Sequence, residues 1–236
     1  MRKLSLLISC VSFALAAEAQ SGAPSDRLDL SSWKLTLPVD TPTVGTPDEL
    51  MSKELKGFVD DRHFFVDGEG SVVFRAHCDG VTTKGSRYPR SELRELSNGR
   101  DASWGTEEEK IRTMEATIRV TGLPKKKPHV VFAQIHDARD DVLMCRMEEQ
   151  TLLIERGGHP DVVLARNHPL GKPFDLRIEA GGGRIRVWFD GKSALDWPTV
   201  ARGCYFKAGC YTQSNLAKGD KAEAFGEVRI SRLVLR

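Results

Sequence analysis

The chain has 236 residues, 40% of them hydrophobic, and a formal net charge of +2 at pH 7. This length and composition fit one folded domain of the larger all-β kind. A net charge so close to zero provides no overall field for a polyanion. No nucleic-acid-binding motif is present either, so we expect no nucleic-acid partner.

The first residues have the parts of a secretory signal peptide. Two basic residues at positions 2 and 3 precede an apolar run (4–17), and an A-x-A cleavage site ends at Ala19. The apolar run is too short to cross a bilayer, so we expect no membrane partner. We predict that residues 1–19 are removed, that residues 20–236 form a single domain, and that the protein is secreted.

Strand signals follow one another along the rest of the chain. Short runs rich in β-branched and aromatic residues are separated by turn pairs such as Asp67-Gly68 and Asp190-Gly191. The runs predict strands at residues 33–37, 63–66, 71–76, 90–96, 112–121, 129–136, 142–148, 151–156, 161–165, 174–180, 184–190, 204–213 and 226–235. Thr46–Gly57 has acidic residues near its start and a glycine at its end, which predicts a short helix. So many short strands predict an all-β jelly-roll sandwich of two antiparallel sheets, with a concave groove.

Four cysteines remain once Cys10 is removed with the signal peptide: Cys78, Cys145, Cys204 and Cys210. An even number in an exported protein is compatible with two disulfides, for which three pairings exist. If the segment from Cys204 to Cys210 is one unbroken strand, their Cα atoms lie about 20 Å apart. That separation is too large for a bond between these two, and the connectivity stays open. No C-x-x-C pair is present, which disfavours a zinc site.

Three of the predicted strands carry an ordered polar face. Alternate side chains of a strand point to opposite faces, so residues two apart lie on the same side. The residues that share these faces are Arg90, Glu92 and Arg94; Gln134 and His136; and Lys207, Gly209, Tyr211 and Gln213. A face buried in a core would be apolar at these positions. The three strands therefore predict one groove lined by Arg, Gln, His, Lys and Tyr.

These residue types suit the cleavage of a uronic acid polymer by β-elimination. The proton at C5 is only weakly acidic while the neighbouring carboxylate keeps its negative charge. Arg90 can neutralise that carboxylate through two hydrogen bonds. Gln134 and His136 can donate hydrogen bonds to the oxygens on which charge accumulates in the enolate-like transition state.

The same reaction needs a base for the C5 proton and an acid for the departing O4. Tyr211 suits the acid's role, and it can also serve as the base if nearby cations such as Lys207 or Arg94 stabilise the phenolate. His136 titrates near working pH and is the other candidate base. The scheme requires no metal and no other cofactor.

The segments YPRSELREL, FAQIHD and YFKAGCYTQS, in this order, resemble the three signature segments of polysaccharide lyase family 7, the jelly-roll alginate lyases. The resemblance extends from about Leu30 to Arg236. It implies that Arg90, Gln134 and His136 neutralise the substrate carboxylate and that Tyr211 is the catalytic acid, often also the base. It implies substrate-binding or supporting roles for Glu92, Arg94, Lys207 and Gln213. Members with isoleucine inside the Gln-x-His segment, as Ile135 here, tend to accept guluronate.

We therefore predict a secreted, monomeric, endo-acting alginate lyase whose products carry 4,5-unsaturated uronate ends. Three alternatives are weighed against it. The first is a lyase for another polyuronate, such as glucuronan. The second is a glycoside hydrolase, which would need two carboxylates about 5–10 Å apart, and no strand carries Glu or Asp at i, i+2 and i+5. The third is a non-catalytic carbohydrate-binding module, which would show exposed aromatic residues in place of the ordered Arg, Gln, His and Tyr set.

Overall fold

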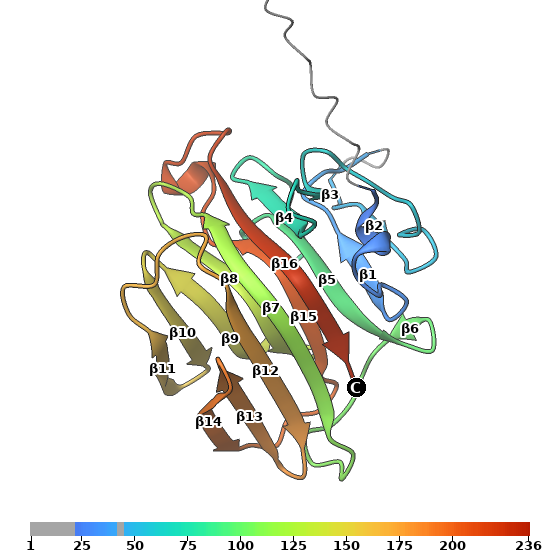
Figure 1. Ribbon diagram of the computed structural model, residues 1–236, viewed down its shortest axis with the longest axis vertical. Helices are drawn as coiled ribbons and strands as arrows, with labels where there is room; N and C mark the ends of the chain where they lie inside the picture. Colours follow the sequence, from blue (N-terminus) through green and yellow to red (C-terminus); the bar gives the residue numbers. More distant parts are fainter. Residues whose placement is uncertain (1–21, 42–44) are drawn as a thin grey trace, which may run out of the picture.

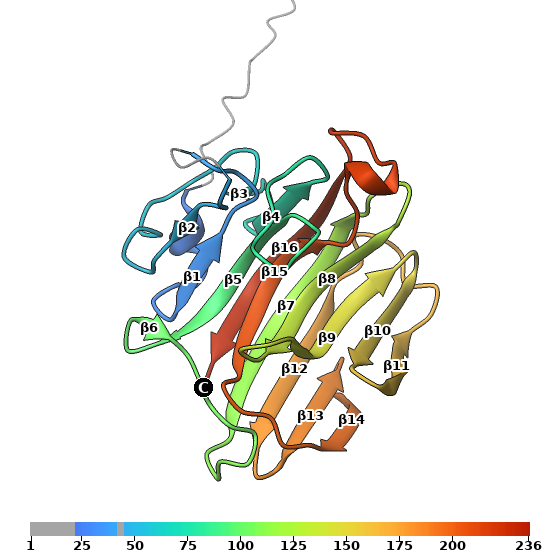
Figure 2. The ribbon, with the colours of Figure 1, turned by 180° about the vertical axis from the view of Figure 1, so that it is seen from behind.

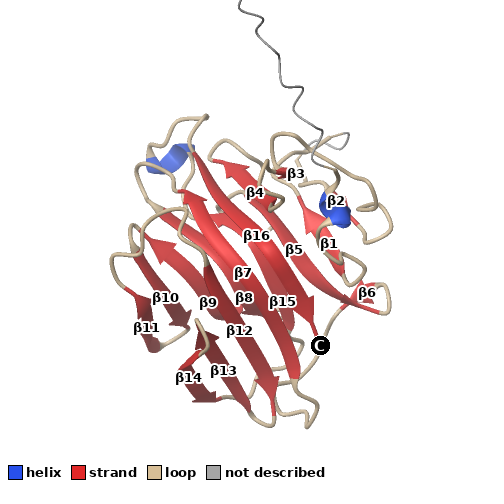
Figure 3. Cartoon of the chain, viewed as in Figure 1, coloured by secondary structure: helices blue, strands red, loops and turns tan. Residues whose placement is uncertain are grey.

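The computed structural model describes residues 22–41 and 45–236 of the chain. The predicted signal peptide (1–19) lies outside the described residues. Strands and loops make up nearly all of the described chain, as Figure 3 shows. Two 3-10 turns, η1 (Pro24–Asp26) and η2 (Leu216–Lys218), are the helical elements in this part of the chain. None of the described helical segments has the length and apolar character that a membrane span requires.

Two antiparallel sheets pack face to face, which confirms the predicted sandwich (Figures 1 and 2). The first, which we call the β15 sheet, has the strand order β11-β10-β9-β8-β15-β5-β1-β2, with β6 paired to β5. Its strands are β1 (Trp33–Thr36), β2 (Glu49–Leu50), β5 (Arg90–Ser97), β6 (Arg100–Asp101), β8 (His129–His136), β9 (Asp141–Glu148), β10 (Thr151–Arg156), β11 (His159–Ala165) and β15 (Tyr205–Thr212).

The second sheet, the β7 sheet, has the order β14-β13-β12-β7-β16-β4-β3 and lies in front in Figure 1. Its strands are β3 (Phe64–Val66), β4 (Val72–His77), β7 (Arg112–Gly122), β12 (Phe174–Gly181), β13 (Arg184–Phe189), β14 (Lys192–Pro198) and β16 (Phe225–Leu235). The predicted strands agree with these to within about two residues. Three strands were not predicted: β14, whose outward positions are polar, and the two-residue strands β2 and β6.

The predicted helix at Thr46–Gly57 is wrong. Glu49 and Leu50 form β2 and pair with Thr36 and Leu35 of β1, and residues 52–57 are turns. The acidic residues that suggested a first helical turn have other partners, since Glu49 makes an ion pair with a lysine of β1. Tertiary pairing outweighs a weak local preference for helix here.

The core lies between the two sheets and is built by alternation. In β12, Phe174, Leu176 and Ile178 are buried, while Asp175 and Arg177 between them are exposed. Each large apolar side chain buried in this way contributes roughly 1.5–3 kcal/mol. In β15 the inward positions are apolar or small, so the core uses one face of that strand and leaves the other face for polar side chains.

A β-bulge in β8 sets the phase of its polar residues. Val131 pairs with Arg146 of β9, but Ala133 pairs with Cys145, so β8 advances by two residues where β9 advances by one. Phe132 and Ala133 are adjacent in sequence, yet both belong to the buried core. The extra residue shifts the alternation after this point, so that the polar side chains near the end of β8 lie on the outer face of the sheet.

The two disulfides that the cysteine count allows do not form among the described residues, because Cys78, Cys145, Cys204 and Cys210 are all free and buried. Cys145 belongs to β9 and Cys210 to β15, whereas Cys204 forms an isolated bridge with Trp104. Burial raises the pKa of the Cys78, Cys204 and Cys210 thiols to about 12. The thiols therefore stay protonated and pack as small apolar groups.

We expect a protein that begins at residue 20 to release four thiols to a thiol reagent after denaturation without reductant, because all four described cysteines are free. The native protein should react slowly, since a buried protonated thiol is a poor nucleophile. A reducing agent should leave the melting temperature unchanged. Two or fewer thiols in the denatured, unreduced chain would show that a disulfide forms.

Candidate active site

A cleft of about 370 Å³ lies on the outer face of the β15 sheet. It crosses the strands, with Thr36 of β1 and Glu49 of β2 at one end and Asp141 of β9 at the other. The segment before β5 and the connection between β8 and β9 border it, and the latter passes in front of the sheet in Figure 2. The predicted site residues that line this cleft are Arg90, Arg94, Gln134, His136, Lys207 and Tyr211.

Strand pairing brings these residues together from distant parts of the sequence. Lys207 of β15 lies between Arg94 of β5 and Gln134 of β8 in the register of the sheet. One step further along the same face, Tyr205 is opposite His136. The three strands therefore present their polar faces side by side, as their alternation predicted.

Glycine at position 209 is required by the close approach of β5 and β15. Gly209 is opposite Glu92, and its φ of 138° is one that other residues rarely adopt. A Cβ atom there would come within 2.7 Å of the carbonyl oxygen of Ser91 and 2.9 Å of the Glu92 Cα. It would also lie 3.0 Å from the ring of Phe74 in the core, so glycine lets the two strands and the core close up beside Glu92.

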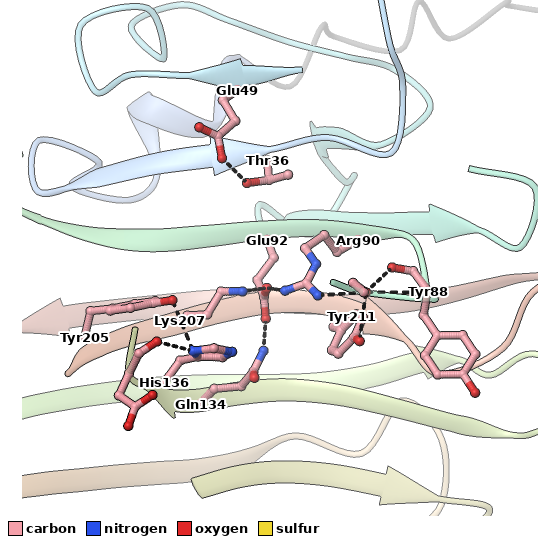
Figure 4. A network of polar contacts seen from close by, with 12 residues as sticks. Thr36, Glu49, Tyr88, Arg90, Glu92, Gln134, His136, Tyr205, Lys207 and Tyr211 are labelled. Carbon is pink, nitrogen blue, oxygen red and sulfur yellow. Dashed lines mark hydrogen bonds and ion pairs between the residues drawn. The ribbon is translucent and has the colours of Figure 1, made fainter. Parts of the chain in front are cut away.

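A buried carboxylate holds the centre of the site together (Figure 4). Glu92 is only 1% exposed and contacts three cleft residues. Arg90 Nη1 donates to Glu92 Oε2 at 2.9 Å, Lys207 Nζ lies 2.5 Å from the same oxygen, and Gln134 Nε2 donates to Oε1. Two cations against one carboxylate leave a net charge of +1 at this point. The cluster therefore keeps an excess positive charge for an incoming anion.

The charges of this cluster depend on one another. Burial alone would raise the pKa of Glu92, but the positive charges of Lys207 and Arg90 outweigh it and hold that pKa below its usual value. Burial lowers the pKa of Lys207 to about 8, although Glu92 opposes the shift. Near neutral pH the carboxylate of Glu92 is ionised and Lys207 is charged, so the ion pairs of the cluster are all formed.

His136 is held as a neutral imidazole with one defined tautomer. Its Nδ1 lies 2.6 Å from the carbonyl oxygen of Asp137, which can only accept a hydrogen bond, so Nδ1 carries the proton. Burial lowers the pKa of His136 below its usual value and Lys207 adds to the effect, although the hydrogen bond to the Asp137 carbonyl opposes it. Within the described part of the chain, Nε2 has no hydrogen-bond partner. Its lone pair is free to accept a proton in the cleft.

Tyr205 packs against His136 and was not predicted as a site residue. The two rings stack with centroids 5.5 Å apart and 20° between planes, and the Tyr205 hydroxyl is 3.1 Å from His136 Nδ1. The guanidinium of Arg94 covers the Tyr205 ring at 3.9 Å and lies 3.4 Å from Asp101. The strand alternation that selected Lys207 and Tyr211 also includes Tyr205, so that pattern contained the signal.

Tyr211 lies on the other side of the cluster, as Figure 4 shows. Its ring is covered by the Arg90 guanidinium at 3.9 Å, and its hydroxyl is 3.0 Å from the Ser86 hydroxyl. The ring of Tyr88 lies 6.3 Å away. Ser86 and Tyr88 precede β5 in an irregular segment, where no periodic pattern marks a residue as part of a site.

Two predicted substrate-binding residues do not line the cleft. Gln213 follows the end of β15, is 8% exposed, and donates its backbone N–H to the carbonyl of His129. Its side-chain nitrogen is buried without a partner among the described residues. The Glu92 side chain is also buried beneath the cleft surface, because its carboxylate contacts only the cleft residues that cover it. The geometry gives Glu92 a supporting position and places Gln213 outside the site.

The family model described as "Alginate lyase" matches residues 28–236. The chain belongs to polysaccharide lyase family 7, the alginate lyases. The structure of alginate lyase AlgAT5 from this family is 44% identical and has a TM-score of 0.86, covering 91% of this chain and 98% of its own. The alginate lyase from Corynebacterium sp. is 36% identical, with a TM-score of 0.85 over 91% of this chain and 98% of its own.

A third similar structure contains an oligosaccharide. It is alginate lyase A1-II' with one histidine and one tyrosine replaced, in complex with the substrate GGMG. It is 25% identical to this chain, with a TM-score of 0.77 over 91% of this chain and 96% of its own. These matches agree with the two-sheet sandwich fold.

The residues of this alginate lyase family member provide a proton acceptor, a hydroxyl donor and a positive centre in one cleft. His136 supplies the acceptor, Tyr211 the hydroxyl, and Arg90 with Lys207 the charge. Among residues 22–41 and 45–236, no group of three or more His, Cys, Asp or Glu side chains is placed to hold a metal ion.

Replacing Glu92 by glutamine should lower the activity of the lyase more than replacing any single exposed charged residue. An amide cannot neutralise Arg90 and Lys207, and breaking a buried ion pair costs about 3–5 kcal/mol. We expect a lower melting temperature and a loss in kcat/KM of about 100-fold. Glu115→Gln is the matched control, since Glu115 also pairs with two arginines but lies on the β7 sheet. Equal losses in both variants would contradict the central position of Glu92.

Proposed function

We propose that this protein is a secreted, endo-acting alginate lyase that cleaves preferentially at guluronate, with His136 as the base and Tyr211 as the acid. The observation that carries the proposal is the arrangement of a neutral imidazole and a phenol on either side of one cationic cluster (Figure 4). Arg90, Lys207 and Gln134 would bind the uronate carboxylate between them. Alginate oligosaccharide bound to the related A1-II' enzyme supports this substrate class.

The proposed reaction is a β-elimination in which His136 Nε2 removes the C5 proton of the sugar. The electrons of the C5–H bond form a double bond between C4 and C5, and the bond from C4 to the glycosidic oxygen breaks. Tyr211 gives its proton to that oxygen. Afterwards His136 releases the C5 proton to water and the phenolate takes up a proton from water, which restores both groups. Arg90 and Lys207 stabilise the negative charge that builds up on the carboxylate in the transition state. Stabilisation by such preorganised charges is usually the largest single contribution to the rate enhancement.

The preference for guluronate follows from the positions of base and acid. In guluronate the C5 proton and the C4 oxygen are both axial and lie on opposite faces of the ring. In mannuronate they lie on the same side, where one group can serve as both base and acid. His136 and Tyr211 flank the Arg90–Glu92–Gln134 cluster, which suits an approach to the sugar from two sides.

The endolytic mode is supported by the course of the cleft. Besides two connections, its lining includes residues of six strands in the order β2, β1, β5, β15, β8 and β9. At a strand spacing of about 4.8 Å, this corresponds to about 24 Å of sheet, enough for several sugar units. The reacting groups lie on β8 and β15, within this span rather than at an end. A bound chain would extend past them in both directions.

Secretion and a monomeric state complete the proposal. The apolar run and A-x-A site at the N-terminus support export. A polymer the size of alginate meets an enzyme more readily outside the cell. All groups used in the scheme come from one chain, so a second copy is not needed for the reaction.

The test is to incubate the purified protein with alginate, polyguluronate, polymannuronate and glucuronan. Ultraviolet absorbance of the new conjugated double bond should rise, fastest with polyguluronate, and viscosity should fall early because internal bonds are cut. Tyr211→Phe should lose turnover but keep binding, because only the hydroxyl is removed. New reducing ends without that absorbance would indicate hydrolysis and end the proposal. A faster reaction on polymannuronate or glucuronan would overturn its substrate preference.

The pH dependence of kcat/KM should reflect His136 and Lys207. His136 acts in its neutral form, and its pKa is lowered from the usual 6.5, so the acidic midpoint should lie below that value. Lys207 acts in its charged form, and its pKa is about 8, so activity should fall as the pH rises through about 8. Lys207→Arg should move the alkaline limb upward, since arginine stays charged. An unchanged alkaline limb in that variant would assign it to another group.

A further inference from the structure

The hydroxyl of Ser86 connects Tyr211 to the segment that precedes β5. Its oxygen lies 3.0 Å from the Tyr211 hydroxyl and 3.2 Å from Arg90 Nη2, which donates to it. The backbone N–H of Tyr88 also donates to this oxygen, at 3.2 Å, while the carbonyl of Tyr88 lies 3.1 Å away as an acceptor. Four polar groups thus surround one serine oxygen.

The number of hydrogen-bonding positions decides the direction of the bond to Tyr211. A hydroxyl oxygen accepts two hydrogen bonds and donates one. Arg90 and the backbone N–H of Tyr88 fill both accepting positions of the Ser86 oxygen. Tyr211 could donate to that oxygen only if it accepted a third hydrogen bond. The single serine proton then faces two acceptors, the Tyr88 carbonyl oxygen at 3.1 Å, to which Ser86 donates, and the Tyr211 oxygen at 3.0 Å. We infer that Ser86 is a positioning residue that donates its O–H to the phenolic oxygen of Tyr211.

This direction has two consequences for the proposed reaction, on which the inference rests for the role of Tyr211. The proton of Tyr211 is not used by Ser86 and can point into the cleft toward the leaving oxygen. When that proton is transferred, the Ser86 O–H stabilises the phenolate, and the Arg90 guanidinium over the ring adds to the stabilisation. Ser86 therefore supports Tyr211 in the way an oxyanion-hole donor supports a developing negative charge.

A spectroscopic titration tests the inference without substrate. The chain has three tyrosines, so the tyrosinate band of Tyr211 can be isolated by subtracting the spectrum of Tyr211→Phe. In Ser86→Ala the band should form at a pH about one unit higher, because the phenolate loses a hydrogen bond worth about tenfold or more. Ser86→Thr keeps a hydroxyl and should titrate like the original protein. Thr82→Ala, in the same segment but outside the cleft lining, is the matched control and should also be unchanged.

Kinetics on alginate provide the second readout. Ser86→Ala should lower kcat by about 10- to 100-fold with little change in KM, because the hydroxyl acts through the proton donor. Ser86→Thr should restore most of the rate, and the melting temperatures should show that all variants fold. An unshifted tyrosinate band in Ser86→Ala would overturn the inference even if activity fell. A shifted band in a protein that does not degrade alginate would keep the inference and reject the proposed function.

Discussion

The site depends on one buried carboxylate. Glu92 gathers Arg90, Lys207 and Gln134 around its two oxygens, and without it two cations would face each other in a poorly solvated place. Burying an ion costs several kcal/mol unless partners compensate it, so the position of each group constrains the others. An anionic substrate thus meets a centre whose geometry is fixed before it arrives. The one positive charge that Glu92 does not neutralise can attract the carboxylate of the substrate.

The fold makes this cluster possible by separating two tasks on the same strands. The inward faces of β8 and β15, with Leu93 of β5, belong to the hydrophobic core, and the outward faces of these strands carry the polar residues. The bulge in β8 keeps the two faces in phase, because it places Phe132 and Ala133 both inward before Gln134. Gly209 lets the backbones of β5 and β15 approach closely beside Glu92. Core packing and site geometry are therefore fixed by the same backbone.

Alternation along strands carried most of what could be foreseen. It located nearly all the long strands and grouped Arg90, Gln134, His136 and Tyr211 on faces that do converge, since a strand's period of two is a strong local signal. It could not foresee that Glu92 is buried, because burial depends on which strands are neighbours. Cysteine count and export suggested disulfides, but pairing depends on distances between strands. The helix expected at Thr46–Gly57 was wrong because strand pairing with β1 outweighed local preference.

The groups proposed to transfer protons differ from the charged centre in how they are held. The cluster around Glu92 is positioned by the register of three strands, whereas His136 and Tyr211 each depend on irregular backbone at opposite strand ends. The Asp137 carbonyl, just after β8, fixes the tautomer of His136, and Ser86, just before β5, contacts the hydroxyl of Tyr211. In the proposed reaction, charge neutralisation is thus a property of the sheet, and proton transfer a property of its connections. On that proposal, changes in those two connections would alter the reaction's stereochemical preference while the cluster around Glu92 stays intact.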